Sequence, residues 1–179
     1  FDYSQQEPRL VVHYASLDQD TSAFGVKDSY LNENADFHTV VAKMADIPRE
    51  QAKTINLGLF YGMGKAKLQA ELGVSKEKAE ELFSIYHSRV PFVKNLMNSV
   101  SNRAQQRGQI RTLLGRLCRF PLWEPNQFGM HKALPFEQAV QEHGPGIKRA
   151  YTYKALNKLI QGSAADMTKK SMLDLYKEG

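Results

Sequence analysis

The stretch from Pro48 to Lys65, PREQAKTINLGLFYGMGK, constrains the fold of this chain more than any other. Proline is favoured in the first turn of a helix, where its missing N–H is not needed. Side chains at four-residue steps then drift by only about 40° per step, so they form one stripe along a helix of roughly 18 Å. The stripe runs from cations to an aromatic ring and consists of Arg49, Lys53, Leu57 and Tyr61.

Glycines stand beside this stripe at Gly58, Gly62 and Gly64, although a glycine inside a helix costs about 1 kcal/mol relative to alanine. One interpretation is that they let a bulky planar ligand approach Tyr61, because glycine has no Cβ. The stripe has about the length of a nucleoside triphosphate and the base it stacks on. The alternative is a contact between two helices through small residues, with the cations simply solvated. The local pattern leaves both interpretations open.

Helical patterns dominate the rest of the chain. Apolar residues recur at helical spacing after Pro8, and Asp36, Ser75 and Pro91 are typical of helix starts. Residues 109–120 alternate about an LLGR turn, which predicts a β-hairpin.

Two segments are predicted to lack regular structure. Residues 18–36 are polar and indicate a loop with at most a short helix, and residues 121–146 carry four prolines. From 148 to 177 the helical pattern returns, with a possible break at Gly162. The predicted fold class is therefore mainly α with a small β component.

The composition is that of an ordinary globular chain, with 179 residues of which 42% are hydrophobic and 24% charged. No apolar run approaches the ~20 residues of a membrane span, and no signal peptide opens the sequence. Cys118 is the only cysteine, which favours a reducing compartment. The net charge of +5 favours a polyanionic partner. We expect no membrane association.

Five segments, in order, resemble the motifs of family A, polymerase I-like, DNA polymerases. DYSQQEPR resembles motif A, DFHTVVA the segment before motif B, REQAKTINLGLFYG motif B, TLLGRLCRFP the following hairpin, and ALNKLIQGSAADMTKKSM the segment after it. Leu57 stands where bacterial members carry Phe or Tyr, and the excursion at 121–146 is longer than theirs, so the resemblance is to a phage-type member. Such a protein is expected in the cytoplasm, which for a phage is that of the bacterial host.

The resemblance implies the fingers subdomain and a partial palm of a right-hand polymerase. Residues 1–10 correspond to a palm segment, 11–147 to the fingers with the motif B helix, and 148–179 to a returning palm segment. Motif C, the thumb and any exonuclease domain are then expected as partner segments beyond this sequence. Because motif C supplies a second carboxylate, we expect this fragment alone to be inactive.

The implied reaction is DNA-templated transfer of a nucleotide from a dNTP to a primer 3′-OH. Such enzymes use two Mg²⁺ ions held between carboxylates. The resemblance makes Asp2 the catalytic metal ligand from motif A, with the main-chain carbonyl of Tyr3 as a further ligand. Glu7 matches the steric gate that leaves no room for a ribose 2′-OH, and Gln5 matches a supporting position in the dNTP site.

The same resemblance assigns the triphosphate to His38, Arg49 and Lys53, with Lys53 also a catalytic general acid for the leaving pyrophosphate. Tyr61 matches the residue that stacks beside the new base pair, although a core tyrosine is the alternative. Leu57 matches the position that selects against dideoxynucleotides, and a leucine, lacking a hydroxyl, predicts discrimination.

DNA contacts are implied for the hairpin and the last helix. Asn157 and Gln161 lie one helical turn apart and match residues that reach minor-groove acceptors, which correct base pairs share. Arg116 follows the hairpin glycine and is a candidate phosphate contact, or simply a surface arginine.

Two other functions compete with a DNA polymerase of this kind. A single-subunit RNA polymerase shares the right-hand architecture, but Glu7 argues against it because that enzyme must admit the 2′-OH. A non-catalytic helical DNA-binding module explains the charge but not Asp2 and Glu7 together.

Overall fold

The helix starts marked in the sequence are where the chain begins its helices. The computed structural model describes residues 3–33, 35–61, 63, 65–127 and 129–178. Asp36 accepts a hydrogen bond from the Thr39 N–H at 2.9 Å, and Ser75 accepts one from the Lys78 N–H at 3.2 Å, as N-cap residues do. Gly108, with φ +67°, ends the long helix. These three predictions are confirmed.

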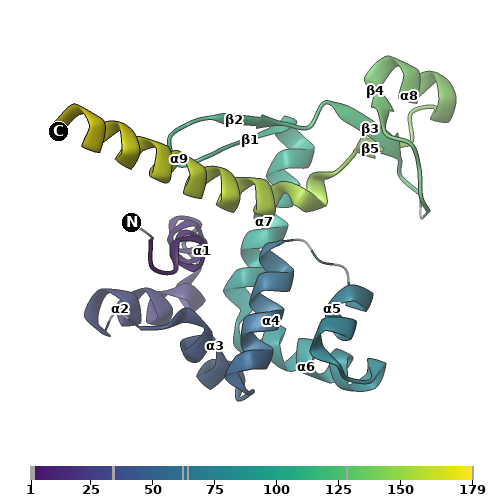
Figure 1. The fold of residues 1–179 in the computed structure, drawn as a ribbon. Coiled ribbons are helices and arrows are strands. Elements are labelled where there is room, and N and C mark those ends of the chain that lie inside the picture. Colours follow the sequence, from purple (N-terminus) through teal and green to yellow (C-terminus); the bar gives the residue numbers. More distant parts are fainter. Residues whose placement is uncertain (1–2, 34, 62, 64, 128, 179) are drawn as a thin grey trace. The chain divides into compact units, whose positions relative to one another are not determined.

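The chain divides into two compact units, Phe1–Asn98 and Ser99–Gly179 (Figure 1). The first unit is helical, and α7 runs from it into the second. Its elements are α1 (Gln6–Leu17), the 3₁₀ helix η1 (Thr21–Ala23), α2 (Phe24–Glu33), α3 (Phe37–Ala45), α4 (Arg49–Phe60), α5 (Lys65–Leu72), α6 (Lys76–Arg89) and α7 (Pro91–Arg107).

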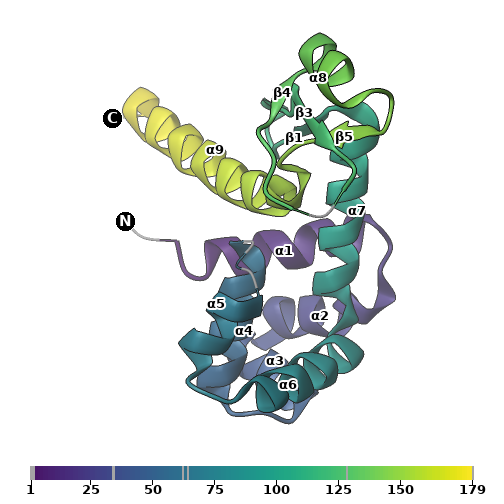
Figure 2. The ribbon, with the colours of Figure 1, turned by 90° about the vertical axis from the view of Figure 1, so that its right-hand side faces the viewer.

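Aromatic rings fill the core of the first unit. The Phe37 ring lies 5.8 Å from that of Phe60 and 6.3 Å from that of Phe92, centroid to centroid, and all three are buried. Helix α3 packs against α4 and α6, and α5 packs against the same two helices (Figures 1 and 2). Tyr86 is also fully buried.

The polar segment at 18–36 is not a loop, and this prediction was largely wrong. It forms η1 and α2, because Asp20 accepts hydrogen bonds from the Ser22 N–H at 3.0 Å and from Asn95 Nδ2 at 2.8 Å. Ala23 and Val26 are buried on the inner side. A helix with so few apolar residues gives a weak periodic signal, so tertiary packing decides its structure.

Among the described residues, the second unit contains two small sheets and the longest helix. The predicted hairpin is confirmed, with β1 (Gln109–Arg111) pairing antiparallel to β2 (Leu117–Arg119). The other elements are β3 (Leu122–Pro125), β4 (Leu134–Pro135), α8 (Phe136–His143), β5 (Ile147–Arg149), the 3₁₀ helix η2 (Thr152–Lys154) and α9 (Ala155–Glu178). The mainly α fold class with a small β component is therefore confirmed.

Residues 121–146 are more regular than predicted. They supply β3, β4 and α8, and with β5 they make an antiparallel sheet of order β4-β3-β5. Pro135 stands in the short edge strand β4 and also precedes α8, two places where a missing N–H is tolerated. Trp123 packs on Phe136 with ring centroids 5.1 Å apart, and Arg149 covers Trp123 at 4.4 Å.

The expected break at Gly162 does not occur, because α9 continues through it to Glu178. A Cβ on Gly162 would lie 2.8 Å from Thr112 Cγ2. The glycine therefore lets the hairpin end approach the helix closely. Within the described residues, no helix combines the length and apolar character needed to cross a membrane.

Candidate functional site

The predicted stripe lies along the outer side of α4. Ala52, Ile55 and Phe60 are buried on the inner side. Arg49 and Lys53 are exposed, Leu57 is half-buried and Tyr61, the C-cap residue, is 43% exposed. Tyr61 is therefore no core tyrosine, and it lies at the end of a basic surface.

The two cations of the stripe differ in their partners. Arg49 Nε lies 3.0 Å from Asp36 Oδ2, and its Nη1 lies 2.9 Å from Glu50 Oε1. The hydrogen bond to Asp36 raises the pKa of Arg49 further. Lys53 is exposed and forms no ion pair with any described residue. An incoming phosphate would thus find the ammonium of Lys53 available, whereas Arg49 must exchange a carboxylate for it.

Burial opposes the charge of Asp36, but hydrogen bonds from Thr39 and Arg49 outweigh it and hold the pKa of Asp36 below its ordinary value. The same carboxylate thereby caps α3 and anchors the first residue of α4. One acid thus ties the predicted motif B helix to the segment before it.

His38 is buried, with 9% of its surface exposed. Burial lowers its pKa, the nearby Arg49 and Lys53 lower it further, and Asp36 and Glu50 act in the opposite direction. The ring is therefore neutral near pH 7. Any contact it makes with a phosphate is a hydrogen bond, and the positive charge of the site comes from the two cations of α4.

A hydrogen bond joins α1 to the end of α4. The Tyr61 hydroxyl donates to Glu7 Oε2 at 2.7 Å. The two residues are 54 positions apart in sequence, so the bond places the predicted gate residue beside the predicted stacking residue. It also fixes the position of the Glu7 carboxylate.

Gln5 is committed to contacts inside the protein. It has the left-handed φ of 53° before α1. Its Oε1 accepts from the Phe37 N–H at 2.7 Å and from the Tyr30 hydroxyl at 3.2 Å, while its Nε2 donates to the Ala35 carbonyl at 3.3 Å. The Gln5 side chain thus connects the start of α1 to α2 and to the start of α3. Tyr3 is 43% exposed, and Asp2 lies outside the described residues.

Gly58 faces α5. A Cβ added there would lie 2.6 Å from Leu68 Cδ1, and Leu68 is buried. For Gly58 the helix-contact interpretation therefore holds, and the interpretation that it makes room for a base is wrong. Gly62 and Gly64 lie outside the described residues.

Arg116 is held by the protein in the second unit. Its Nε lies 2.9 Å from Asp166 Oδ1 and its Nη2 donates to the Gly162 carbonyl at 2.9 Å. Asp166 is buried and also accepts from the Thr112 hydroxyl. Burial raises the pKa of Asp166, but the bonds from Thr112 and Arg116 outweigh it, so the pKa lies below its ordinary value.

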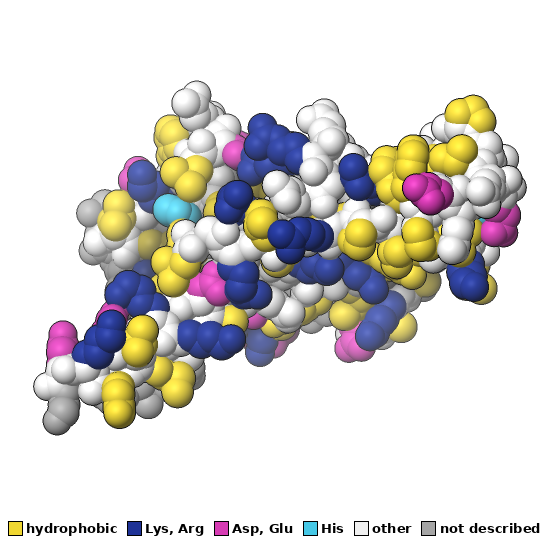
Figure 3. Space-filling view, turned by 90° about the horizontal axis from the view of Figure 1, so that it is seen from above, with side chains coloured by type: hydrophobic (Ala, Val, Ile, Leu, Met, Phe, Trp, Pro, Cys, Tyr) yellow, Lys and Arg dark blue, Asp and Glu magenta, His cyan; other side chains and the backbone are white. Residues whose placement is uncertain are grey.

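Asn157 and Gln161 share one face of α9, the first half-buried and the second exposed. Neither amide has a hydrogen-bond partner among the residues that the structure describes. Lysines and arginines gather over α9 and the β1–β2 hairpin (Figure 3). Those that are exposed include Arg111, Arg119, Lys158 and Lys169. This face of the second unit is suited to a phosphate backbone.

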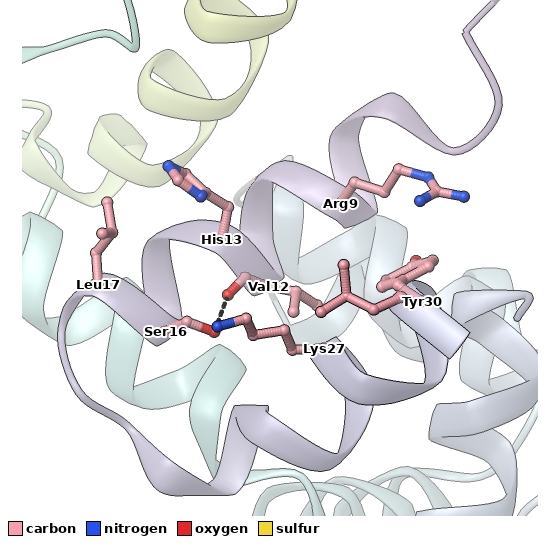
Figure 4. Close-up of a pocket in the computed structure, with 8 residues that line it drawn as sticks. Arg9, Val12, His13, Ser16, Leu17, Lys27 and Tyr30 are labelled. Atoms are coloured by element: carbon pink, nitrogen blue, oxygen red, sulfur yellow. Dashed lines mark hydrogen bonds between the residues drawn. The ribbon is translucent and has the colours of Figure 1, made fainter. Parts of the chain in front are cut away.

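The first unit also has a pocket of about 400 Å³, which lies between α1 and α2. Figure 4 shows Arg9 and Tyr30 at one end of it and Leu17 at the other. The Arg9 guanidinium lies 4.5 Å from the centroid of the Tyr30 ring. None of the predicted nucleotide-binding residues lines this pocket.

Sequence reasoning gave no hydrogen-bonding role to Asn56, Tyr86 or Asp166, and it placed Tyr86 only in the apolar core. Asn56 and Tyr86 are fully buried and bonded to each other. A polar amide on the apolar side of a helix was the available signal for Asn56, because a buried amide needs partners. Tyr86 and Asp166 gave no comparable signal, since each fits its helix without a special role.

Comparison with known proteins agrees with these motifs. The sequence matches DNA polymerase family A over residues 1–179. A DNA-directed DNA polymerase of Pseudomonas phage M6 is 34% identical over 220 residues, which cover 99% of this chain and 30% of the relative. DNA polymerase I of Geobacillus stearothermophilus is 32% identical over 178 residues, which cover 97% and 18%.

Among solved structures, the POL domain of Pol1 from M. smegmatis, in complex with DNA primer-template and dNTP, superposes with a TM-score of 0.73 at 28% identity. The match covers 99% of this chain and 29% of that one. The chain thus spans less than a third of the length of these relatives. With the family pattern matched along its whole length, this chain belongs to DNA polymerase family A.

Proposed function

We propose that this chain forms the fingers and part of the palm of a DNA-templated DNA polymerase. The observation that carries the proposal is the hydrogen bond from Tyr61 to Glu7, because it joins the motif A and motif B segments at the aromatic end of a basic helix. A nucleotide needs these three features together: cations for its phosphates, a shaped contact for its sugar and a flat surface for its base.

The triphosphate lies along the first two turns of α4 in this proposal. Lys53 offers an exposed ammonium, and Arg49 adds a second charge once it leaves Asp36. Cations that meet the leaving pyrophosphate stabilise charge that grows in the transition state. Lys53 is the candidate proton donor to that leaving group, and neutral His38 contributes a hydrogen bond.

The sugar and the base lie at the other end of the stripe. Tyr61 holds the Glu7 carboxylate in one position, so a 2′-OH would meet a fixed group and not a mobile one. Leu57 lies between the phosphate and base ends of the stripe and is half-buried. Its lack of a hydroxyl supports discrimination against dideoxynucleotides, which Leu57→Tyr should relax.

The second unit supplies the contacts to primer-template DNA. Asn157 and Gln161 are the candidates for the minor groove, and the exposed cations of α9 and the hairpin are those for phosphates. We keep the assignment of residues 1–10 and 148–179 to the palm and 11–147 to the fingers, with the other palm strands and the thumb as partners. A cytoplasmic location is part of the same proposal.

The family resemblance implies two Mg²⁺ ions, which when bound would supply Lewis-acid activation of the 3′-OH and the phosphate. The donors assigned to them are the Asp2 carboxylate and the Tyr3 main-chain carbonyl, and Asp2 lies outside the described residues. The described part of the chain has no group of three or more His, Cys, Asp or Glu that could hold a metal ion.

Primer extension by a full-length polymerase that carries this sequence tests the proposal. Glu7→Ala should raise the use of ribonucleotides far more than it alters the use of deoxynucleotides, whereas Glu80→Ala, an exposed acid on α6, should change neither. Equal changes with both sugars would mean that Glu7 is no gate. Efficient ribonucleotide use by the unmutated enzyme would favour the RNA polymerase alternative, and no template-dependent extension would favour a binding module.

A further inference from the structure

A chain of three polar side chains crosses the core of the first unit. Tyr86 comes from α6, Asn56 from α4 and His38 from α3, and the first two are fully buried. The Tyr86 hydroxyl donates to Asn56 Oδ1, and Asn56 Nδ2 lies 3.0 Å from His38 Nδ1. Buried polar groups are costly unless they are hydrogen-bonded, and these two contacts give each of the three side chains a partner.

The order of donors and acceptors decides where His38 carries its proton. Tyr86 occupies the carbonyl oxygen of Asn56, so the amide presents its NH₂ to the ring. An amide nitrogen only donates, and a neutral imidazole has one donor and one acceptor nitrogen. Nδ1 is therefore the acceptor, and the proton is on Nε2. The opposite amide orientation would make Tyr86 an acceptor and leave Nε2 without its proton.

We propose that Asn56, oriented by Tyr86, is a positioning residue that holds His38 in its Nε2–H tautomer, so that the ring donates a hydrogen bond to the triphosphate. This inference rests on the proposed function, which gives His38 its phosphate contact. It adds two residues that touch no substrate and act only through His38.

The electrostatics show why the tautomer matters. Burial lowers the pKa of His38 and keeps the ring neutral, and the nearby Arg49 and Lys53 act in the same direction, while Asp36 and Glu50 only partly offset these effects. A charged imidazole has a proton on both nitrogens, but a neutral one has a donor at Nε2 in only one tautomer. Without the bond from Asn56, the ring could turn an acceptor toward the phosphate oxygens, which repel it.

The first experiment needs no nucleotide. Nitrogen-15 NMR of the histidine side chains, in the whole chain at neutral pH, distinguishes the two tautomers of His38. We expect Nε2–H in the unmutated chain and a mixture of both tautomers in Tyr86→Phe, which removes only the hydroxyl. The Nδ1–H form in the unmutated chain would overturn the inference.

The second experiment measures dATP affinity against pH. In Asn56→Asp the carboxylate accepts from Nδ1–H, so the neutral ring loses its donor at Nε2 and the pKa of His38 rises. We expect dATP to bind about tenfold more weakly near pH 8, the loss of one hydrogen bond to a charged group, and to recover affinity as the pH falls and the ring becomes charged. A purely structural role would give no such recovery.

Controls separate this inference from the proposed function. Asn102→Asp adds the same charge at an exposed position of α7 and should leave the pH profile of dATP binding unchanged. If His38→Gln binds dATP as the unmutated chain does, the phosphate role of His38 fails, while the NMR result on Asn56 stands. If Asn56→Asp does not fold, Tyr86→Phe still decides: unchanged tautomer and unchanged affinity in it would overturn the role of Tyr86.

Discussion

Two arginine–aspartate pairs of nearly equal length stand in very different surroundings. Arg49 lies 3.0 Å from Asp36 and Arg116 lies 2.9 Å from Asp166. The side chain of Asp36 is 33% exposed, whereas that of Asp166 is 8% exposed. Water can replace Arg49 at Asp36, so the pair can open for a ligand. Nothing can replace Arg116 at Asp166 without cost, since a buried charge needs its partner.

This difference separates an arginine that can bind a ligand from an arginine that stabilises the fold. Both arginines stand in segments that resemble polymerase motifs, and sequence reasoning made both of them candidate ligand contacts. The structure shows that the ion pair in the first unit borders an exposed lysine, while the one in the second unit ties the hairpin to α9. Resemblance to a motif thus identifies an arginine, but the burial of the aspartate that it pairs with decides whether the arginine can contact a ligand.

The largest expected effect is at Lys53, the cation next to the pair that can open. Lys53→Ala should lower kcat/KM for dNTP by about 10²-fold in a full-length polymerase, which corresponds to ~2.7 kcal/mol. The reason is that the variant loses an ionic interaction with the phosphates that becomes stronger in the transition state. The stability of the protein should hardly change. Steady-state kinetics against Lys43→Ala, an exposed lysine of α3, measure this. Unaltered kinetics would move the triphosphate away from α4.

Arg116→Ala should instead act on stability. The buried Asp166 carboxylate would lose one of its bonds, which costs about 1–2 kcal/mol after allowing for the half-exposed arginine. Urea unfolding followed by the fluorescence of Trp123 reports on the same unit. Arg49→Ala, the matched variant of the exposed pair in the first unit, should destabilise the protein less when the unfolding of both variants is followed by circular dichroism. A larger loss in Arg49→Ala would reverse the comparison.

Much of the fold could be predicted because capping and turn residues act locally. Asp36, Ser75 and Gly108 fixed the ends of three helices through their own backbone contacts. Helix α2 and the sheet around β3 were missed, because they depend on contacts distant in sequence. The Trp123 ring, for example, lies between Phe136 and Arg149.

The candidate site shows the same division. Resemblance selected Glu7, Lys53 and Tyr61 by position, and their exposure and contacts agree with a ligand site. It could not show that Gln5 is committed to protein contacts, since that depends on the path of the chain near Ala35. It also could not show that burial makes His38 neutral.

A substitution at Gly58 tests whether this glycine serves helix packing or a ligand contact. Gly58→Ala should destabilise the chain by about 1 kcal/mol, because the new Cβ meets the flexible end of Leu68 and the gain in helix propensity offsets part of the strain. Gly25→Ala, in α2 with no atom within 4 Å of the new Cβ, should stabilise it slightly. Thermal unfolding by circular dichroism compares them. A loss of dATP affinity in Gly58→Ala without loss of stability would restore the role in making room for a base.

The smallest expected effect is the pH dependence of the buried pair. The pKa of Asp166 is held below its ordinary value in the folded chain, and in the unfolded chain it is about 3.9. Its contribution to stability is therefore complete above about pH 5 and is lost as the pH falls through the folded pKa. Asp166→Asn lacks this contribution at every pH, so its deficit in the free energy of unfolding should shrink between about pH 5 and pH 3.

Asp36→Asn should show a smaller deficit at neutral pH, because asparagine still caps α3 and the exposed pair contributes little. Urea unfolding of both variants across this range measures the two deficits. If the deficit of Asp166→Asn stays constant down to pH 3, its charge is not what binds Arg116, and the contrast between the two pairs rests on packing alone.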